Sequence, residues 1–380
     1  DGKRPVLLAA RNAHKALLYA AALLDFDIRW LWPSAQAEGA LCSCPVTAEA
    51  LTGALHAMAQ QGNTPFGVYV TSPDYLGGVQ ELPALAAVCR AQGVPLLVDN
   101  AHGAYLRFLP QNCHPIAQGA AMCCDSAHKT LPVVTGGAYL HLAHDAPVQD
   151  EAAVRGALAL FGSTSPSYLI LQSLDACNAV LAGDYPRRLV QCCAALEGLR
   201  RSLNKTAAAR QCPVPLAVAG AQQEPMKLTL DAAALGCTGT ALADALRRAQ
   251  LECEYADPRY VVLMFTPENP PQDYTRLQTV LEQLLAAVPA GLLRPENRAG
   301  EFAALQQQAA QRCTIRQAVL GAQVRVPVHK ALGRVCAMPT VSCPPAIPVA
   351  VSGEEDHPAG HRPDAALWHR GTLGAAIKIL

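Results

Sequence analysis

VPLLVD, at Val94–Asp99, is an apolar run that ends in an aspartate, and similar runs recur through the first 145 residues. Most are apolar throughout, and stretches with helical spacing separate them. Continuous apolar strands are typical of a parallel sheet that is covered by helices on both faces. The expected strands are Val6–Ala9, Gly67–Thr71, Pro95–Asp99, Met122–Asp125 and Gly137–Leu142, and the expected helices are Lys15–Leu23, Thr47–Gln60 and Glu81–Gln92. The sequence therefore predicts an α/β fold with a mainly parallel sheet.

The rest of the chain is expected to form smaller units. A helical region at about Ser167–Ser202 leads to a second, smaller α/β unit with strands Met226–Leu230 and Tyr260–Phe265 and helices Gly239–Ala249 and Gln272–Ala287. A helix over Ala299–Gln311 precedes a proline-rich segment, Met338–Pro348, which cannot be helical. We divide the chain into a large domain (1–165), a connecting helical region (166–205), a small α/β domain (206–292) and a C-terminal helix with an extended segment (293–380).

Charge and length exclude several functions. The 380 residues contain 30 basic and 30 acidic side chains without a block of like charge, so nothing predicts a nucleic-acid or anionic membrane surface. The apolar stretch Ala16–Leu24 is far shorter than the ~20 residues of a membrane span. A small molecule or a second copy of the chain is the expected partner. Because an apolar strand follows Asp1 almost at once, we expect further sequence upstream.

The cysteines point to a reducing compartment. There are 15, an odd number, and neither C-x-x-C nor a zinc-site spacing occurs among them. We interpret them as small buried hydrophobes in a cytoplasmic protein, and predict no metal site.

Ser126-Ala127-His128-Lys129 follows the strand at Met122–Asp125, and its lysine lies 30 residues after Asp99. Most lysines are solvated surface charges, but an apolar run precedes this one and the Gly136-Gly137 turn follows it. Burial lowers the pKa of a lysine and so supplies the neutral amine that attacks an aldehyde. The Ser126 hydroxyl and the His128 imidazole could bind a phosphate dianion.

Asp99 has two interpretations. An aspartate at a strand end is commonly a turn former or a helix cap. Alternatively, its carboxylate faces a pyridine nitrogen and keeps it protonated, with His102 orienting the acid or lining the pocket. A lysine that forms a Schiff base and an acid of this kind are what a pyridoxal 5'-phosphate (PLP) enzyme requires.

Two further groups are ambiguous by themselves. His14, directly after the first strand, could stack on an aromatic ring or lie in solvent at a helix start. Ser163, Thr164 and Ser165 precede a helix, where hydroxyls can cap the helix, bind phosphate, or do both.

Four motifs together resemble those of the Orn/Lys/Arg decarboxylase family of fold type I PLP enzymes, in the same chain order. They are RNAHK (Arg11–Lys15), VPLLVDNAH (Val94–His102), DSAHK (Asp125–Lys129) and STSPSY (Ser163–Tyr168). The resemblance continues through Asp257–Pro267, Gly333–Val335, Pro344–Pro348 and Gly353-Glu354 and so covers roughly residues 5–355. It implies a PLP-dependent transferase-like large domain followed by the smaller C-terminal α/β domain.

The resemblance also implies a role for each site residue. Lys129 is the Schiff-base lysine, Asp99 pairs with the pyridinium nitrogen and His14 stacks on the ring. Ser126 and His128 lie at the cofactor phosphate, and His102 lines the cofactor pocket. The hydroxyls of Ser163, Thr164 and Ser165 reach the phosphate of a neighbouring subunit's cofactor, which makes a homodimer the smallest active unit.

The chain departs from the family in several places. The family's Gly/Ser-rich phosphate loop precedes the first strand found here. A tryptophan of the well-characterised basic amino-acid decarboxylases is replaced by His102, and Ala346 replaces a glycine. After Glu354 the resemblance fades.

The function that the resemblance implies is decarboxylation of a basic amino acid (arginine, lysine or ornithine) to the amine and CO2. The substrate's orientation would then decide which bond breaks. An aminotransferase or another lyase remains an alternative, because the same aspartate and lysine serve those reactions and Arg259 or Arg334 could bind a substrate carboxylate. A third possibility is an inactive remnant that binds PLP poorly.

Overall fold

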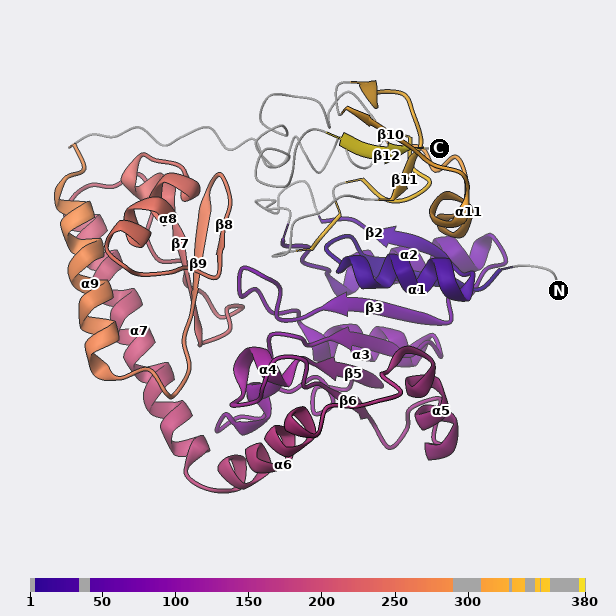
Figure 1. The fold of residues 1–380 in the computed structure, drawn as a ribbon, viewed down its shortest axis with the longest axis horizontal. Coiled ribbons are helices and arrows are strands. Elements are labelled where there is room, and N and C mark those ends of the chain that lie inside the picture. Colours follow the sequence, from indigo (N-terminus) through magenta and orange to yellow (C-terminus); the bar gives the residue numbers. More distant parts are fainter. Residues whose placement is uncertain are drawn as a thin grey trace.

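The computed structural model describes residues 4–33, 42–289, 309–327, 330–338, 346–348, 350–355 and 376–379. Its largest sheet has the strand order β2-β1-β3-β4-β5-β6, and only β6 runs antiparallel to its neighbour (Figure 1). The strands are β1 (Val6–Ala10), β2 (Asp27–Leu31), β3 (Gly67–Thr71), β4 (Leu96–Asp99), β5 (Met122–Asp125) and β6 (Tyr139–Leu142). The predicted mainly parallel sheet is confirmed, and the five predicted strands are all present.

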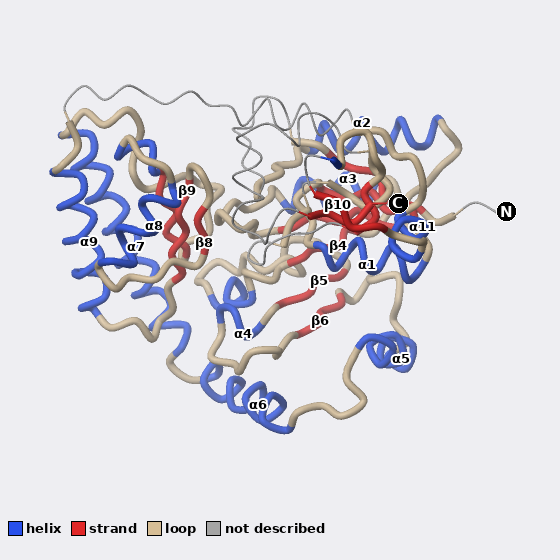
Figure 2. Tube along the Cα trace, turned by 45° about the horizontal axis from the view of Figure 1, so that its top comes forward, coloured by secondary structure: helices blue, strands red, loops and turns tan. Residues whose placement is uncertain are grey.

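Helices cover both faces of this sheet, which explains why its strands are apolar throughout. Leu8 and Ala10 of β1 pack in one cluster with α2 (Ala48–Gln60) and α3 (Leu82–Ala91), whereas Leu7 and Ala9 pack on the other face with α1 (Lys15–Leu24). The alternation follows from the two-residue repeat of a strand. Figure 2 shows these helices on the two sides of the strands.

Strand β2 was not predicted from the sequence. This strand, Asp27–Leu31, lies at the edge of the sheet and carries Asp27 and Arg29, so it lacks the apolar run of the inner strands. It is placed by Asp25, the residue that ends α1 in the left-handed conformation with φ 56°. Charged residues are common on edge strands because they discourage pairing with other chains.

The predicted helical region at Ser167–Ser202 is two helices instead of one. The first, α6 (Tyr168–Ala182), ends at Gly183, and the second, α7 (Tyr185–Ala209), starts with a proline in its first turn. Proline is tolerated at that position because the first N–H groups of a helix have no partner within the helix. A further helix, α5 (Glu151–Phe161), precedes both and was not predicted.

The second α/β unit contains an antiparallel sheet of order β7-β9-β8. Its elements are β7 (Lys227–Asp231), η2 (Ala232–Leu235), α8 (Gly239–Arg248), β8 (Tyr255–Ala256), β9 (Tyr260–Met264) and α9 (Pro271–Ala286). Leucines of α7 and α9 pack with this sheet in one core cluster. Both strands and both helices predicted for this region are confirmed.

The C-terminal part returns to the large sheet. Helix α11 (Ile315–Leu320) packs against α1, and Arg316 donates to the carbonyl oxygen of Ala22 at 2.8 Å. Strands β10 (Val324–Pro327), β12 (Ala376–Ile379) and β11 (Cys336–Met338) form a third sheet in that order. Most of the expected helix Ala299–Gln311 and of the segment Met338–Pro348 lies outside the described residues, and Gln311 itself forms an isolated bridge with Glu354.

No described helix is both long enough and apolar enough to cross a membrane. The described cysteines are free thiols, and about half of them are buried, as expected for small hydrophobes.

Candidate active site

Most of the predicted cofactor residues lie at or just beyond the carboxyl ends of the central strands. Asp99 is the last residue of β4, where it pairs with Thr71 of β3 and Cys124 of β5. A single residue, Ser126, separates β5 from the short helix α4 (Ala127–Thr130), which carries Lys129. Parallel strands bring their carboxyl ends to the same edge, which is where ligands bind in such sheets (Figure 1).

Lys129 contacts His102 directly. The Nζ atom of Lys129 lies 3.2 Å from Nε2 of His102, and the His102 side chain is buried. Burial lowers the pKa of His102 well below its usual 6.5, and the nearby positive charges of Lys227 and Lys129 lower it further. The imidazole is therefore neutral, and its Nε2 can accept a hydrogen bond from Lys129.

Asp99 is a turn former, as one of its two interpretations has it, and its pairing with a pyridine nitrogen stays a prediction. Its Oδ1 accepts a hydrogen bond from the backbone N–H of Ala101 at 3.1 Å, as a turn former does, and its Oδ2 accepts one from the Tyr69 hydroxyl at 2.9 Å. Burial raises the pKa of Tyr69 well above 10, and the Asp99 charge raises it further, so this hydroxyl stays a donor. The carboxylate is thus fixed in position at the strand end.

His14 lies close enough to Asp99 and Lys129 for the charges of both to affect it. It occupies the N-cap position of α1, where its Nδ1 accepts a hydrogen bond from the N–H of Ala16 at 3.1 Å. Burial lowers the pKa of His14, while Asp99 raises it and Lys129 lowers it. His14 therefore lies at a helix start with its imidazole half-buried, and its stacking on a cofactor ring stays a prediction.

The residues predicted at the phosphate differ in their surroundings. His128 bonds through Nδ1 to the carbonyl oxygen of Gly137 at 2.9 Å, which leaves its Nε2 available. Ser126 precedes α4 and makes no capping bond with its side chain. Ser163 and Ser165 lie in the exposed loop between α5 and α6, where the N–H of Ser165 donates to the Ser163 hydroxyl at 3.1 Å.

The structure therefore brings together Lys129, His102, Asp99 and His14 and leaves the hydroxyls of Ser163, Thr164 and Ser165 exposed to solvent. The contribution of these hydroxyls to a neighbouring subunit's cofactor stays a prediction.

Sequence reasoning missed Lys227. This buried lysine comes from β7, and its Nζ donates to the carbonyl oxygen of Asp74 at 2.8 Å and lies 5.5 Å from the centre of the Tyr75 ring. Burial lowers its pKa, although the charges of Glu224 and Asp74 raise it. The only sequence signal is a lysine at the head of KLTLD, a strand in which leucines alternate with polar residues.

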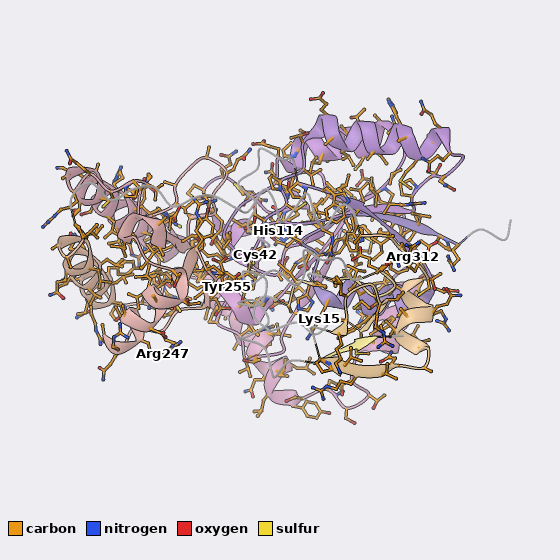
Figure 3. All side chains as sticks on the ribbon, turned by 90° about the horizontal axis from the view of Figure 1, so that it is seen from above. Lys15, Cys42, His114, Arg247, Tyr255 and Arg312 are labelled. Carbon is orange, nitrogen blue, oxygen red and sulfur yellow. The ribbon has the colours of Figure 1, made fainter. Side chains whose placement is uncertain are left out.

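Aromatic rings line the boundary between the site and the small sheet. Tyr75 packs edge-to-face on His102 at 4.8 Å between ring centres and on Tyr255 at 5.3 Å. Tyr255 in turn accepts a hydrogen bond from the Cys42 thiol at 3.3 Å, and Figure 3 shows these two residues side by side. These contacts anchor the outer side of His102.

The residues present fit PLP. Buried polar atoms without a hydrogen-bond partner among the described residues include Nδ1 of His102, the hydroxyls of Thr71 and Thr130, and Oδ1 of Asn100. Buried polar atoms without a partner are rare in folded proteins, and a polar ligand at the site would supply a partner to those that face it. The anion, the amine and the two imidazoles also match the groups that the cofactor requires.

Comparison with known proteins agrees with this geometry. A family model described as "Orn/Lys/Arg decarboxylase, major domain" matches residues 2–222. An arginine decarboxylase of Bacillus subtilis is 27% identical over 92% of this chain and 70% of its own length. The uncharacterised protein YaaO of the same organism is 29% identical over 68% of this chain, and the match spans about half (52%) of YaaO.

Solved structures show the same fold. The lysine decarboxylase LdcF of Francisella novicida superposes with a TM-score of 0.75 at 17% identity, over 100% of this chain and 67% of its own. Mouse CSAD superposes less closely, with a TM-score of 0.53 at 16% identity over 74% of this chain and 64% of its own.

Proposed function

Since this chain belongs to the Orn/Lys/Arg decarboxylase family, whose members depend on PLP, we propose that it decarboxylates a basic amino acid to the amine and CO2. The observation that carries the proposal is the 3.2 Å contact between Lys129 and His102 at the strand edge that Asp99 also occupies. Arginine and lysine are candidate substrates because the similar proteins are named arginine and lysine decarboxylases, and ornithine is a candidate because the family model names it.

Four residues would hold the cofactor. Lys129 would bind its aldehyde carbon through Nζ, Asp99 would pair with its ring nitrogen, and His14 would lie against the ring. His128 would offer Nε2 to its phosphate. When bound, PLP supplies an electron sink for the bond that breaks at the substrate's α-carbon.

The chain's own groups control the proton. Because His102 is neutral, its Nε2 accepts a hydrogen bond from Lys129 Nζ and would orient that amine. Lys129 Nζ is then the group placed to return a proton to the product carbon. The buried charge of Lys227 disfavours a charged His102 and so keeps its Nε2 a hydrogen-bond acceptor for Lys129.

Asp99 acts through its fixed charge. The Tyr69 hydroxyl and the Ala101 N–H hold both carboxylate oxygens, so the charge needs no reorganisation when a cation forms beside it. Tyr75 packs on His102 and would exclude water from the His102 side of the site.

We further propose a homodimer. The helices α5 and α6 expose large apolar side chains that a solvated surface does not favour. They are Leu158, Leu160 and Phe161 of α5 and Leu169 and Leu171 of α6, with Tyr168 at the start of α6. A second copy that covers this face would bury them and bring the intervening hydroxyls of Ser163, Thr164 and Ser165 towards its own cofactor.

The free thiols are consistent with a reducing cytoplasm.

The function is tested by supplying PLP with carboxyl-labelled arginine, lysine or ornithine and measuring labelled CO2, amine and keto acid together. The proposal predicts equal amounts of CO2 and amine from one of the three. Keto acid without CO2 would identify an aminotransferase instead. No product, from a protein that stays colourless with excess PLP, would identify an inactive remnant.

A further inference from the structure

A second cluster of reactive side chains lies behind the active site. His114, Cys123 and Asp125 are all buried, and one ligand atom of each lies within 4.8 Å of the others. Cys123 and Asp125 are two residues apart on β5, so they project from the same face, opposite to Cys124, which approaches Asp99. The cluster is therefore separate from the groups that would hold PLP.

A fourth side chain joins the cluster from the neighbouring strand. His141 of β6 pairs directly with Cys123 in the antiparallel register, and its Nε2 lies 3.0 Å from Oδ2 of Asp125. Its ring lies 4.9 Å from that of His114, between centres. Figure 3 shows His114 inside the body of the molecule, whereas the His141 side chain is 38% exposed, which gives an ion a path from solvent.

We propose that His114, Cys123 and Asp125 bind a zinc ion, with His141 as the fourth ligand. Nitrogen, oxygen and sulfur are the donors that zinc prefers.

The distances between the donor atoms match a tetrahedral zinc site. Usual zinc–ligand bond lengths place nitrogen and oxygen about 3.3 Å apart, and sulfur about 3.5 Å from either. Here His114 Nε2 lies 3.1 Å from Asp125 Oδ2 and 3.7 Å from Cys123 Sγ, and Cys123 Sγ lies 3.9 Å from Asp125 Oδ1. Shifts of a few tenths of an ångström would therefore bring these three donors to zinc distances, whereas His141, which lies outside the 4.8 Å group, would have to rotate towards the ion to become the fourth ligand.

Charge balance also favours a divalent cation. His114 Nε2 and His141 Nε2 lie 3.1 Å and 3.0 Å from Oδ2 of the buried Asp125 carboxylate. Zinc would displace the thiol proton to solvent and form the Zn–S bond, so that one thiolate and one carboxylate neutralise the ion. Asn100 donates to Asp125 Oδ1 at 2.7 Å and would hold the carboxylate from outside.

The ion would connect β5, β6 and the segment before β5 directly beneath Ser126, where the Lys129 helix begins. It would act as a structural tie, and it does not depend on the proposed decarboxylation. The zinc-site spacing was absent from the sequence because the donors come from three segments.

The first test is the metal content of the purified chain. Protein from zinc-supplemented cells, passed over a chelating resin, should retain about one zinc per chain by mass spectrometry. Cys123→Ser and His114→Gln should lose it, and His141→Ala should hold it more weakly. Cys89→Ser is the matched control, because Cys89 is also buried in the same core cluster but lies on α3, and it should leave the content unchanged. Wild-type protein without zinc, or variants that keep it, would overturn the proposal.

The second test needs no variant. Cobalt(II) added to chelator-treated wild-type protein should give the intense visible bands of a tetrahedral site and a thiolate charge-transfer band, and zinc should abolish both. Added zinc should also raise the melting temperature. Weak octahedral bands and an unchanged melting temperature would mean that the cluster is only a hydrogen-bonded network around Asp125.

Discussion

At the scale of residues, the candidate site depends on a few buried groups whose charges are set by their neighbours. His102 is neutral because it is buried beside two lysines, and Asp99 is held by Tyr69 and its own turn. Lys129, Asp99, His102 and His14 could be predicted from sequence because each lies at or just beyond a strand end. Tyr69 could not, since nothing in a strand sequence shows which hydroxyl reaches the next strand.

The Asp99 carboxylate should matter more than the hydroxyl that holds it. We expect Asp99→Asn to lower kcat by roughly 100-fold to 1,000-fold, because it removes a preorganised charge. Tyr69→Phe should cost roughly 10-fold, the equivalent of one hydrogen bond. Steady-state kinetics measure both, and Tyr274→Phe is the control, because its hydroxyl contacts Cys192 in the small unit. Equal losses in the two Tyr variants would contradict the positioning role of Tyr69.

Burial of His102 should make stability depend on pH. The unfolded chain binds a proton at this histidine below about pH 6.5, whereas the folded chain does not, since its pKa lies well below 6.5. The contribution of His102 to the free energy of unfolding is therefore fully present above pH 6.5. It is lost as the pH falls below that value, by up to about 1.4 kcal/mol per pH unit. Urea unfolding of the PLP-free protein between pH 7 and pH 5 measures this, and His102→Gln should show a shallower slope. Parallel curves for the two proteins would exclude the explanation.

At the scale of elements, the inner strands were predictable because burial on both faces leaves a continuous apolar run. The edge strand β2 and the exposed helix α5 have no such signal, and tertiary contacts decide them. The position of Lys227 beside the site depends on how two sheets pack together. Lys227 and its partner Asp74 are 153 residues apart in sequence, so this contact could not be predicted. The domain limits at 165, 205 and 292 stay a prediction.

The turn after β4 should tolerate no side chain at Gly103. A Cβ there would lie 2.0 Å from Oδ1 of Asn100 and 2.7 Å from Pro73, so Gly103→Ala must displace the turn that carries Asp99 and His102. We expect a loss of stability of about 2 kcal/mol or more. Gly53→Ala in the exposed interior of α2 is the control and should stabilise the protein by about 0.5–1 kcal/mol, because a Cβ there meets nothing. Chemical unfolding measures both, and an unchanged Gly103→Ala variant would contradict the model of this turn.

At the scale of the whole molecule, the apolar face of α5 and α6 predicts that the chain works as a dimer. A double variant, Leu160→Asp with Leu169→Asp, should shift the protein from dimer to monomer in sedimentation velocity and remove most activity. Leu320→Asp is the control, because Leu320 is similarly exposed but lies on α11. A double variant that stays dimeric, or a fully active monomer, would rule out the predicted interface.

The central claim is that Lys129 holds PLP, and covalent trapping tests it most directly. The protein is saturated with PLP, reduced with borohydride, digested and analysed by mass spectrometry. We predict the reduced pyridoxyl group on Lys129 alone, together with a visible absorbance that is absent from Lys129→Ala. Lys227, a buried lysine near His102, provides the internal comparison. A label on Lys227, or an unmodified Lys129 in fully saturated protein, would contradict the account.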